Sequence, residues 1–407
     1  MLIKRTLPPA ATPIHIRDIL NGLRGLTRRQ YEIERFRGEL RTYFGIKHCF
    51  LVSSGKAALT LIFKALHARY PEKGAVIIPA YTCYSVPSAV RRAGLDIKLC
   101  DIDADTLDFD YRLLGKMLSG PEADRILAVV PRHFFGVPAD IDRLRRVTSG
   151  LEIAIVEDAA QVMGGEEKGK KFGTMGDAGV FSLGRGKPFS TVEGGIILTD
   201  RDGLAGRIQR LVVNLAEYTI IENVSLFLKS VLLTIFMHPQ LFWFPKSLPF
   251  LKIGATIYDP GFAIRRLSPF QAGLSYGWRD RLHLLMKIRT INARYWASCL
   301  KDIPALANSI SQSFTGNGAD APVRFPVLMG NEVEAKRLLR ESEAKGLGIM
   351  MTYPDSVDGI SELSLQIDGR RFPVARQYAK NLLTFPTHSF VSDIDKRRIA
   401  QLLSSLF

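Results

Sequence analysis

Seven short apolar runs alternate with amphipathic stretches between residues 48 and 200, and this alternation restricts the possible folds more than any other feature of the chain. The runs lie at 48–53, 75–79, 96–101, 125–131, 153–157, 179–183 and 195–199. Runs of this kind, separated by helical patterns, are typical of β-α-β units around a largely parallel sheet. One intervening helix is evident at 58–66, where apolar residues recur at the spacing of a buried helical stripe.

The strand pattern fades after residue 200, and the rest of the chain has mainly helical patterns. Helices are expected at 267–300, 332–345 and 393–406, and a strand at 323–328. At 407 residues the chain is long enough for two structural units. We therefore predict an α/β protein with a large domain at 1–252, built on a mostly parallel sheet, and a smaller α+β domain at 253–407. The large domain would carry an apolar insertion at 223–254.

Charge and cysteine usage limit the partners and the location of the protein. A net charge of +15 favours an anionic partner. No basic run is interleaved with aromatic residues, so nucleic acid is not expected. The four cysteines lack CxxC spacing, so they predict neither a metal site nor a disulfide framework. Because the N-terminal sequence also lacks the pattern of a signal peptide, we expect a cytoplasmic protein.

Two segments have residues that are suited to bind a ligand at the edge of the predicted sheet. Residues 53–59, SSGKAAL, place a Ser/Gly turn between a predicted strand and a predicted helix. The unpaired N–H groups at a helix start bind phosphate well, although the same sequence fits an ordinary helix cap. Asp158 follows a predicted buried strand, at the edge where open α/β sheets bind ligands. This carboxylate suits a helix cap, a metal ligand or the partner of a protonated ring nitrogen.

Lys187 lies in a glycine-rich loop, GRGK, between two predicted strands. A surface lysine is the ordinary interpretation of such a residue. A lysine confined among glycines at the edge of the sheet also suits a Schiff base, since confinement near other cations makes an amine more nucleophilic.

These motifs occur in a defined order with several others: SSGKAAL, VIIPAYT, DIDADTLDFD, HFFGVPADID, VEDAAQ, GDAGVFSLGRGK and VEGG. In this order they resemble the DegT/DnrJ/EryC1/StrS family of sugar aminotransferases. The blocks RRLSPFQAGL at 265–274 and NLLTFPTHSFVSDID at 381–395 belong to the same resemblance. The resemblance implies a fold-type-I transferase that uses pyridoxal 5′-phosphate (PLP).

The resemblance also implies roles for individual residues. Lys187 would carry the cofactor as a Schiff base and move a proton during catalysis. Asp158 would keep the pyridine nitrogen of the cofactor protonated, and Gln161 would contact the 3-oxygen of the ring. Backbone or hydroxyl groups of four residues would hold the cofactor phosphate: Gly55, Lys56, Ala57 and Ser182.

Four departures from the family pattern affect these expectations. Lys56 stands where the family often has threonine, and its side chain would either neutralise the phosphate directly or point to solvent. Cys83 stands where the family has an aromatic residue on the cofactor ring, so either Cys83 or, by a shift of one residue, Tyr84 would cover the ring. Ile264 stands where the family sends an asparagine to the phosphate in the partner subunit, and Arg265 is the expected replacement. Residues 184–186 replace the usual His-Pro-Thr, which predicts altered substrate recognition.

We therefore expect an enzyme that transfers an amino group from an amino acid, with glutamate as the expected donor, to a nucleotide-linked keto-sugar. The family also contains sugar dehydratases in which histidine replaces the lysine, and Lys187 argues against that branch. Two alternatives stay open: a PLP-binding protein with a regulatory or scaffolding role, and a PLP enzyme for a lipid-linked or non-sugar substrate. The resemblance also predicts a homodimer with active sites at the subunit interface.

The apolar insertion suits either a membrane surface or a protein contact. Its uncharged stretch at 230–245 is shorter than the roughly 20 residues of a membrane-spanning helix, and a His-Pro pair interrupts it. The aromatic residues at 242–244, with lysines on both sides, suit the surface of an anionic bilayer. We expect a peripheral contact of residues 224–252 with the inner face of the membrane, or else a dimer contact or a cover over the active site.

Overall fold

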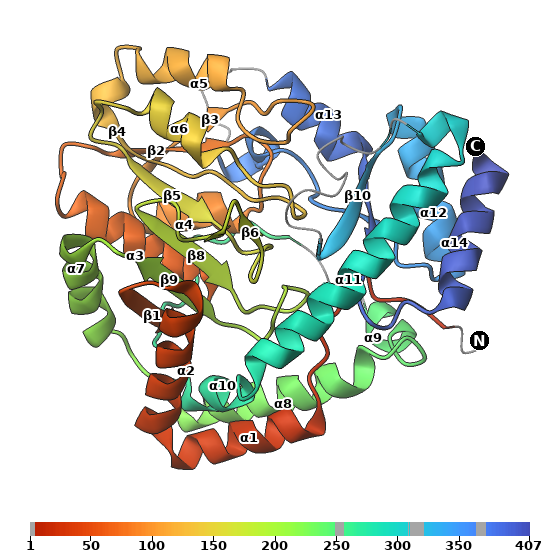
Figure 1. Cartoon of the computed structure of the whole chain (residues 1–407), viewed down its shortest axis with the longest axis horizontal. Helices are drawn as coiled ribbons and strands as arrows, with labels where there is room; N and C mark the ends of the chain where they lie inside the picture. Colours follow the sequence, from red (N-terminus) through yellow and green to blue (C-terminus); the bar gives the residue numbers. More distant parts are fainter. Residues whose placement is uncertain (1–4, 249–255, 308, 310–320, 364–371) are drawn as a thin grey trace.

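Seven strands form the sheet at the centre of the fold, in the order β1-β9-β8-β5-β4-β2-β3 (Figure 1). The strands are β1 (His48–Val52), β2 (Ala75–Pro79), β3 (Asp96–Cys100), β4 (Ile126–Val129), β5 (Ala154–Asp158), β8 (Ala178–Ser182) and β9 (Gly195–Thr199). Each overlaps one of the runs predicted as strands and extends beyond it by at most one residue. Within this sheet β9 is antiparallel to β1 and β8, and the other neighbouring strands are parallel. The predicted α/β fold with a mostly parallel sheet is confirmed.

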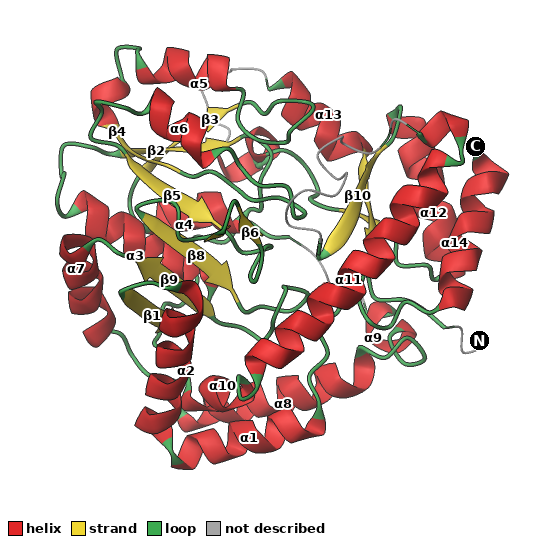
Figure 2. Ribbon diagram, in the orientation of Figure 1, coloured by secondary structure: helices red, strands yellow, loops and turns green. Residues whose placement is uncertain are grey.

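The computed structural model describes residues 5–248, 256–307, 309, 321–363 and 372–407. Helices cover both faces of the central sheet (Figure 2). One face carries α3 (Gly55–His67), α4 (Ser85–Arg92) and α7 (Asp202–Val213), and the other carries α2 (Arg29–Phe44), α5 (Tyr111–Leu118) and α6 (Ile141–Val147). Side chains alternate along each strand. Val76 and Ile78 therefore pack in the core between the sheet and α3, α4 and α7, which we call the first core, whereas Ala75 and Ile77 pack on the other face, against α5 and α6.

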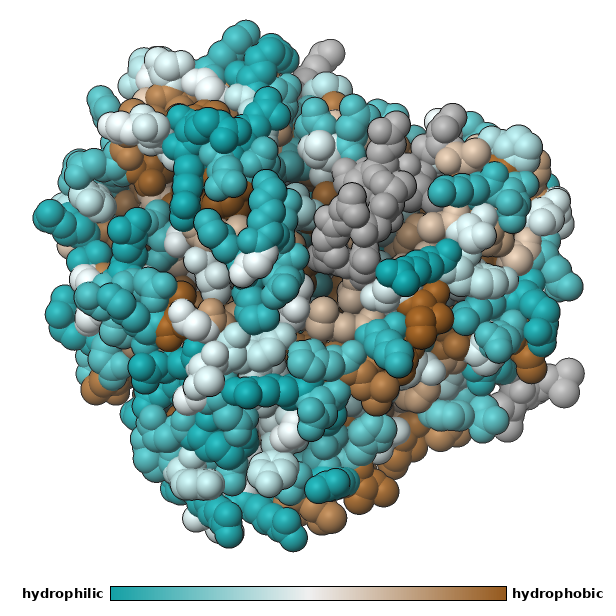
Figure 3. Space-filling model, viewed as in Figure 1, coloured by the Kyte–Doolittle hydropathy of each residue, from teal (hydrophilic) through white to brown (hydrophobic). Residues whose placement is uncertain are grey.

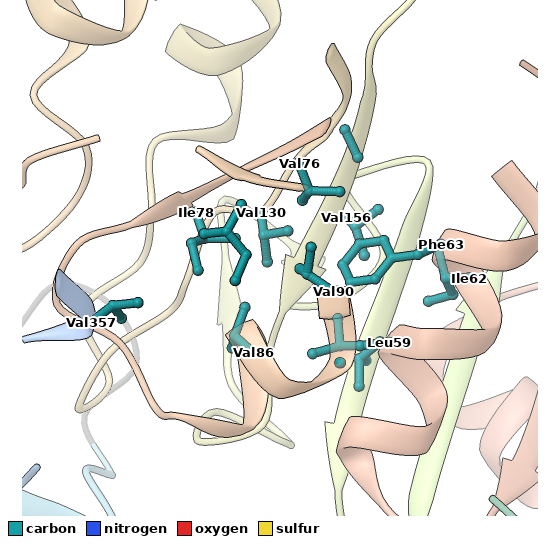
Figure 4. Close-up of a cluster of buried hydrophobic side chains, with 14 of the residues drawn as sticks. Leu59, Ile62, Phe63, Val76, Ile78, Val86, Val90, Val130, Val156 and Val357 are labelled. Atoms are coloured by element: carbon teal, nitrogen blue, oxygen red, sulfur yellow. The ribbon is translucent and has the colours of Figure 1, made fainter. Parts of the chain in front are cut away.

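Helix α3 shows how local sequence positions the future site. Ser54 caps the helix, since its Oγ accepts a hydrogen bond from the Ala57 N–H at 3.1 Å. The predicted apolar stripe faces the sheet, and Figure 4 shows Leu59 and Phe63 among valine side chains of the strands and of α4. The start of α3 is therefore fixed beside the end of β1.

A second, smaller sheet lies at the right of Figure 1, with the order β10-β12-β11 and antiparallel pairing. Its strands are β10 (Arg324–Leu328), β11 (Met350–Met351) and β12 (Leu382–Pro386), and its helices are α12 (Glu332–Lys345), α13 (Pro373–Asn381) and α14 (Asp393–Leu406). Helix α11 (Trp278–Lys301) joins the two parts, because Leu282 packs in the core beside the large sheet and Trp296 packs in the core of the small one. The predicted boundary at residue 252 stays a prediction, since the start of α11 still packs with the large sheet.

Four helices gather at the lower edge of Figure 1: α1 (Ile16–Thr27), α8 (Ile220–Phe236), α9 (Trp243–Lys246) and α10 (Pro269–Leu274). Helices α1 and α10 cross so closely that a Cβ on Gly25 would lie 2.3 Å from the carbonyl oxygen of Pro269. Helix α8 ends before the His-Pro pair at 238–239, as its sequence predicted. None of the helices in the described ranges is both long and apolar enough to cross a membrane.

Candidate active site

Four chain segments meet at the carboxyl edge of the parallel strands. Asp158 ends β5 and Ser182 ends β8, which is the neighbouring strand. A Cβ on Gly55 would lie 3.0 Å from Cβ of Ser182, so the start of α3 lies against the end of β8. Arg132, just after β4, pairs with Asp158 in a parallel bridge. The sequence had placed Gly55, Asp158 and Ser182 at one edge, and the structure brings them together.

The start of α3 has the geometry of an anion site. Gly55 and Lys56 are its first two residues, whose N–H groups have no acceptor within the helix. Ser182 places its hydroxyl beside Gly55, where any larger residue would collide with it. The Ala57 N–H is already bound to Ser54, so this amide differs from the two before it.

The side chain of Lys56 does not extend along this helix start. Its Nζ donates to Oδ2 of Asp259 at 3.0 Å and lies 4.3 Å from the ring centroid of Phe262. The ion pair holds the pKa of Asp259 below its usual value. A contact between the Lys56 ammonium and a phosphate therefore stays a prediction and would require Lys56 to leave Asp259.

Asp158 and Gln161 are buried side by side after β5, each 8 % exposed. Oδ1 of Asp158 accepts the N–H of Ala160 at 3.1 Å. Oε1 of Gln161 accepts the N–H of Phe135, and its Nε2 donates to the hydroxyl of Tyr353 at 3.3 Å. These bonds fix the amide of Gln161, while Asp158 keeps acceptor capacity for a ring N–H.

The other acidic residue of this segment, Glu157, has a structural role on the opposite face of β5. Its carboxylate accepts the N–H groups of Gly173 at 2.9 Å and Met175 at 2.6 Å, and that of Gly176. Nδ1 of His133 accepts the N–H of Ala139, so its Nε2 is the donor to Glu157 at 2.8 Å. Because successive side chains of a strand point to opposite faces, Glu157 is directed to the structural side and Asp158 to the candidate site.

The loop that carries Lys187 is held by its backbone. Arg289 of α11 donates to the carbonyl oxygens of Pro188 at 2.9 Å and Lys187 at 3.1 Å. Thr12 from the N-terminal segment donates to the same Lys187 carbonyl. Gly186 has a φ of +71°, and a Cβ there would lie 3.0 Å from Cβ of Ala10. Within the described part of the chain, no carboxylate forms an ion pair with Nζ of Lys187.

The structure separates the two candidates for the residue that covers the cofactor ring. Tyr84 is buried, and its hydroxyl donates to the carbonyl oxygen of Asp355 at 3.2 Å, where burial raises its pKa to about 12. Cys83 is half-buried and interacts electrostatically with Tyr353, the partner of Gln161. The hydroxyl of Tyr84 is thus bound to the 355 segment, and the residue that covers the cofactor ring stays a prediction.

Arg265 does not extend freely from the chain. Its guanidinium forms an ion pair with Glu222 at 2.6 Å, and its backbone N–H donates to Oγ of Ser53 at 3.1 Å. Ile264 packs at the edge of the first core. The predicted role of Arg265 at a partner subunit stays a prediction.

The aromatic residues at 242–244 differ in exposure, and their contact with a membrane surface stays a prediction. Phe242 is only 2 % exposed, Trp243 is half-buried, and Phe244 is 43 % exposed. The exposed apolar surface lies instead along α8 and the neighbouring α1, where Figure 3 shows brown side chains along the lower edge. Its most exposed members are Ile16, Leu20, Ile220, Ile221, Leu228 and Leu232. Residues 249–254 of the predicted insertion lie outside the described part.

Comparisons with known proteins agree with this site. The sequence profile of the DegT/DnrJ/EryC1/StrS aminotransferase family matches residues 15–404. GDP-perosamine synthase of Caulobacter vibrioides is 31 % identical over 179 residues, which are 44 % of this chain and 47 % of the synthase. The matched part spans less than half the length of the curated relatives.

Solved structures extend the likeness to the whole fold. Helicobacter pylori PseC, an aminotransferase of pseudoaminic acid biosynthesis, has a TM-score of 0.77 at 16 % identity, with 99 % of both chains covered. The Escherichia coli GDP-4-keto-6-deoxy-D-mannose-3-dehydratase with bound hydrated PLP has a TM-score of 0.76 at 21 % identity, covering 98 % of this chain and 100 % of that one. The fold is therefore the one that these aminotransferase and dehydratase structures share. The chain belongs to the DegT/DnrJ/EryC1/StrS aminotransferase family.

The residues present fit PLP. Gly55 leaves room beside Ser182 that a Cβ would fill, next to the N–H groups of a helix start, which suits a phosphate. Buried Asp158 suits the protonated ring nitrogen, and Lys187 provides an amine without an acidic partner in the described chain. The described residues contain no cluster of metal-ligating side chains.

Sequence reasoning missed four residues around this site: Arg132, Arg289, Arg324 and Tyr353. Arg132 had a usable signal, since it follows a buried strand in the same way as Asp158 does. The other three lie at least 90 positions beyond Thr199, the end of the last central strand, and no local pattern marks them.

Proposed function

We propose that this chain is an aminotransferase that transfers an amino group from an amino acid, with glutamate as donor, to a keto-sugar carried by a nucleotide. The observation that supports it most is that Gly55, Asp158 and Ser182 lie together at one edge of the sheet, with Lys187 in the loop that follows Ser182. Two of the related enzymes described above have GDP-linked sugars in their names, which supports a nucleotide-linked sugar as acceptor.

In this proposal the chain's own residues bind, orient and move protons. The bound cofactor supplies the electron sink for the exchange of the amino group. Asp158 holds a proton on the ring nitrogen, because a buried carboxylate makes a charge-assisted hydrogen bond to it. Nζ of Lys187 holds the cofactor covalently between turnovers and moves the proton on the substrate carbon. Arg289 keeps the lysine loop in place through the carbonyls of Lys187 and Pro188.

The test is incubation of the purified protein with L-glutamate and a panel of nucleotide-linked 3- and 4-keto-sugars. Formation of 2-oxoglutarate together with an amino-sugar is the expected result. If PLP binds but no member of the panel yields an amino-sugar, the chain is a PLP-binding protein or acts on another substrate. A dehydratase would instead give a deoxygenated keto-sugar without a new amino group and release the nitrogen taken from glutamate as ammonia, so the amino-sugar itself is the deciding product.

We also propose a homodimer in the cytoplasm, with the exposed face of α1 and α8 as its interface. Apolar side chains such as Ile220 and Ile221, which are 84 % and 82 % exposed, favour a covered face. Sedimentation of the parent and of the Ile221→Lys variant at micromolar concentration tests it, and the variant should dissociate. Co-sedimentation with acidic vesicles would instead support the peripheral membrane contact, provided that the same variant also loses it.

A further inference from the structure

Arg132 is a buried guanidinium with unused donors at the active site. The residue is 4 % exposed, and Nη2 donates to the carbonyl oxygen of Leu107 at 3.4 Å. Nε and Nη1 have no hydrogen-bond partner, and these two nitrogens carry three of the five N–H groups of an arginine. A charged group is costly to bury without acceptors, so such donors need an explanation.

The guanidinium is directed to the ligand side of the sheet. Arg132 and Asp158 are partners in a parallel bridge, and bridge partners point to the same face. The intervening His133 points to the other face, where it binds Glu157. Arg132 therefore lies beside the carboxylate that suits the cofactor ring, yet no described carboxylate is within ion-pair distance of it.

An aromatic cluster fixes the orientation of this guanidinium. Its central carbon lies 3.3 Å from the ring centroid of Phe134 and 5.7 Å from that of Tyr81. Phe134 is stacked on Tyr353 at an interplanar angle of 20°. The side chain is thus held in one position before any ligand arrives, which reduces the entropic cost of binding.

A second arginine approaches from the small sheet. Arg324 begins β10, and its buried Nε has no hydrogen-bond partner. Its Nη1 contacts Sδ of Met350 at 2.8 Å. Burial lowers the pKa of both Arg324 and Arg132, and the hydroxyls of Tyr353 and Tyr81 oppose this shift in both residues. Both guanidinium groups are therefore coupled to the same two tyrosines, of which Tyr353 is bonded to Gln161.

We propose that Arg132, assisted by Arg324, binds a carboxylate group of the substrate beside the cofactor site. The planar guanidinium matches the geometry of a carboxylate, and a ligand oxygen would supply the missing acceptors. The inference rests on the proposed function, because it places the carboxylate in the same site. The carboxylate belongs either to the amino-acid donor or to an acidic sugar.

Equilibrium binding to the PLP-loaded protein tests this without turnover. The probes are glutarate, which represents the donor without its amino group, UDP-glucuronate, which has an acidic sugar, and UDP-glucose as its neutral counterpart. Binding is measured by calorimetry for the parent, Arg132→Met, Arg132→Lys and the exposed control Arg146→Met. Cofactor content is checked first by absorbance.

Because Arg132→Met removes one charge-assisted contact, its affinity for the carboxylate probe should be about 10- to 150-fold lower than that of the parent. Arg132→Lys should recover part of this affinity. If the Arg132 variants bind glutarate more weakly than the parent does, the site belongs to the amino-acid donor. If they bind UDP-glucuronate more weakly but UDP-glucose equally well, the site belongs to an acidic sugar. The proposal is overturned if the parent binds neither carboxylate probe, or if both Arg132 variants bind them as the parent does. If Arg132→Met fails to retain PLP, the result with Arg132→Lys decides.

The outcome separates this inference from the proposed function. A protein that binds glutarate through Arg132 but transfers no amino group supports the carboxylate site and contradicts the aminotransferase proposal. A protein that transfers amino groups with unchanged carboxylate affinity in both Arg132 variants supports the activity and contradicts the site.

Discussion

The stability of this protein should fall in mild acid because of one buried histidine. His388 is fully buried after β12, and its Nε2 donates to the carbonyl oxygen of Pro8 at 2.7 Å. Its Nδ1 accepts the N–H of Phe390 at 3.3 Å, so the neutral ring satisfies both nitrogens. Burial lowers the pKa of His388 from 6.5 to about 4.

The sign of the effect follows from this shift. The unfolded chain takes up the proton as the pH falls through 6.5, whereas the folded chain resists it until the pH is near 4. The contribution of neutral His388 to the free energy of unfolding is therefore fully present above pH 6.5 and is lost as the pH falls toward 4. Full titration corresponds to about 3 kcal/mol, of which about 2 kcal/mol is lost between pH 7.5 and pH 5.

Urea unfolding at these two pH values, followed by circular dichroism, measures the loss. His388→Gln keeps an N–H donor for Pro8 but cannot be protonated, so its decrease in unfolding free energy should be about 2 kcal/mol smaller than that of the parent. The exposed His283→Gln serves as the matched control and should behave like the parent. Equal pH dependence in the parent and in His388→Gln would refute the reasoning.

Three further changes test the site. Lys187→Ala should lose the covalently bound cofactor, seen as loss of the visible absorbance that borohydride removes from the parent. Asp158→Asn should keep PLP but lose about 100-fold or more in kcat, since a neutral amide does not stabilise a protonated ring nitrogen. Arg289→Met should retain PLP and lower kcat more than it changes KM, because it removes the bonds that position the Lys187 loop. Unchanged kcat in either of the last two would make that residue purely structural.

The elements that the sequence predicted well are those in which burial repeats at a regular interval. All seven strands of the central sheet and helix α14 follow from alternation or helical spacing within a few residues. The start of α3 could also be predicted locally, because a serine that caps the helix and the glycine after it occupy the turn between β1 and α3. The edge of the sheet that holds Asp158 and Ser182 could thus be located from local patterns alone.

Contacts between distant segments could not be predicted. Lys56 had two open interpretations, and the structure pairs it with Asp259, 203 positions further along the chain. Arg289 lies on a helical face whose spacing indicated only burial, although its role depends on carbonyls 101 and 102 positions away. The aromatic run at 242–244 suited several kinds of contact, and no local pattern reveals that Phe242 is buried whereas Phe244 is exposed.

These long-range contacts also connect the reactive lysine to the small sheet. The N-terminal segment is bound to His388 through Pro8 and to the Lys187 carbonyl through Thr12. Arg289 contacts that same Thr12 hydroxyl at 3.2 Å and belongs to α11, which packs in both cores. The N-terminal segment and Arg289 therefore bind the Lys187 carbonyl together and also bind each other. Protonation of His388 would occur on Nδ1, because Nε2 already carries the hydrogen donated to Pro8. Acid would thus break the bond from the Phe390 N–H, whereas the connection of His388 to the N-terminal segment through Pro8 would persist.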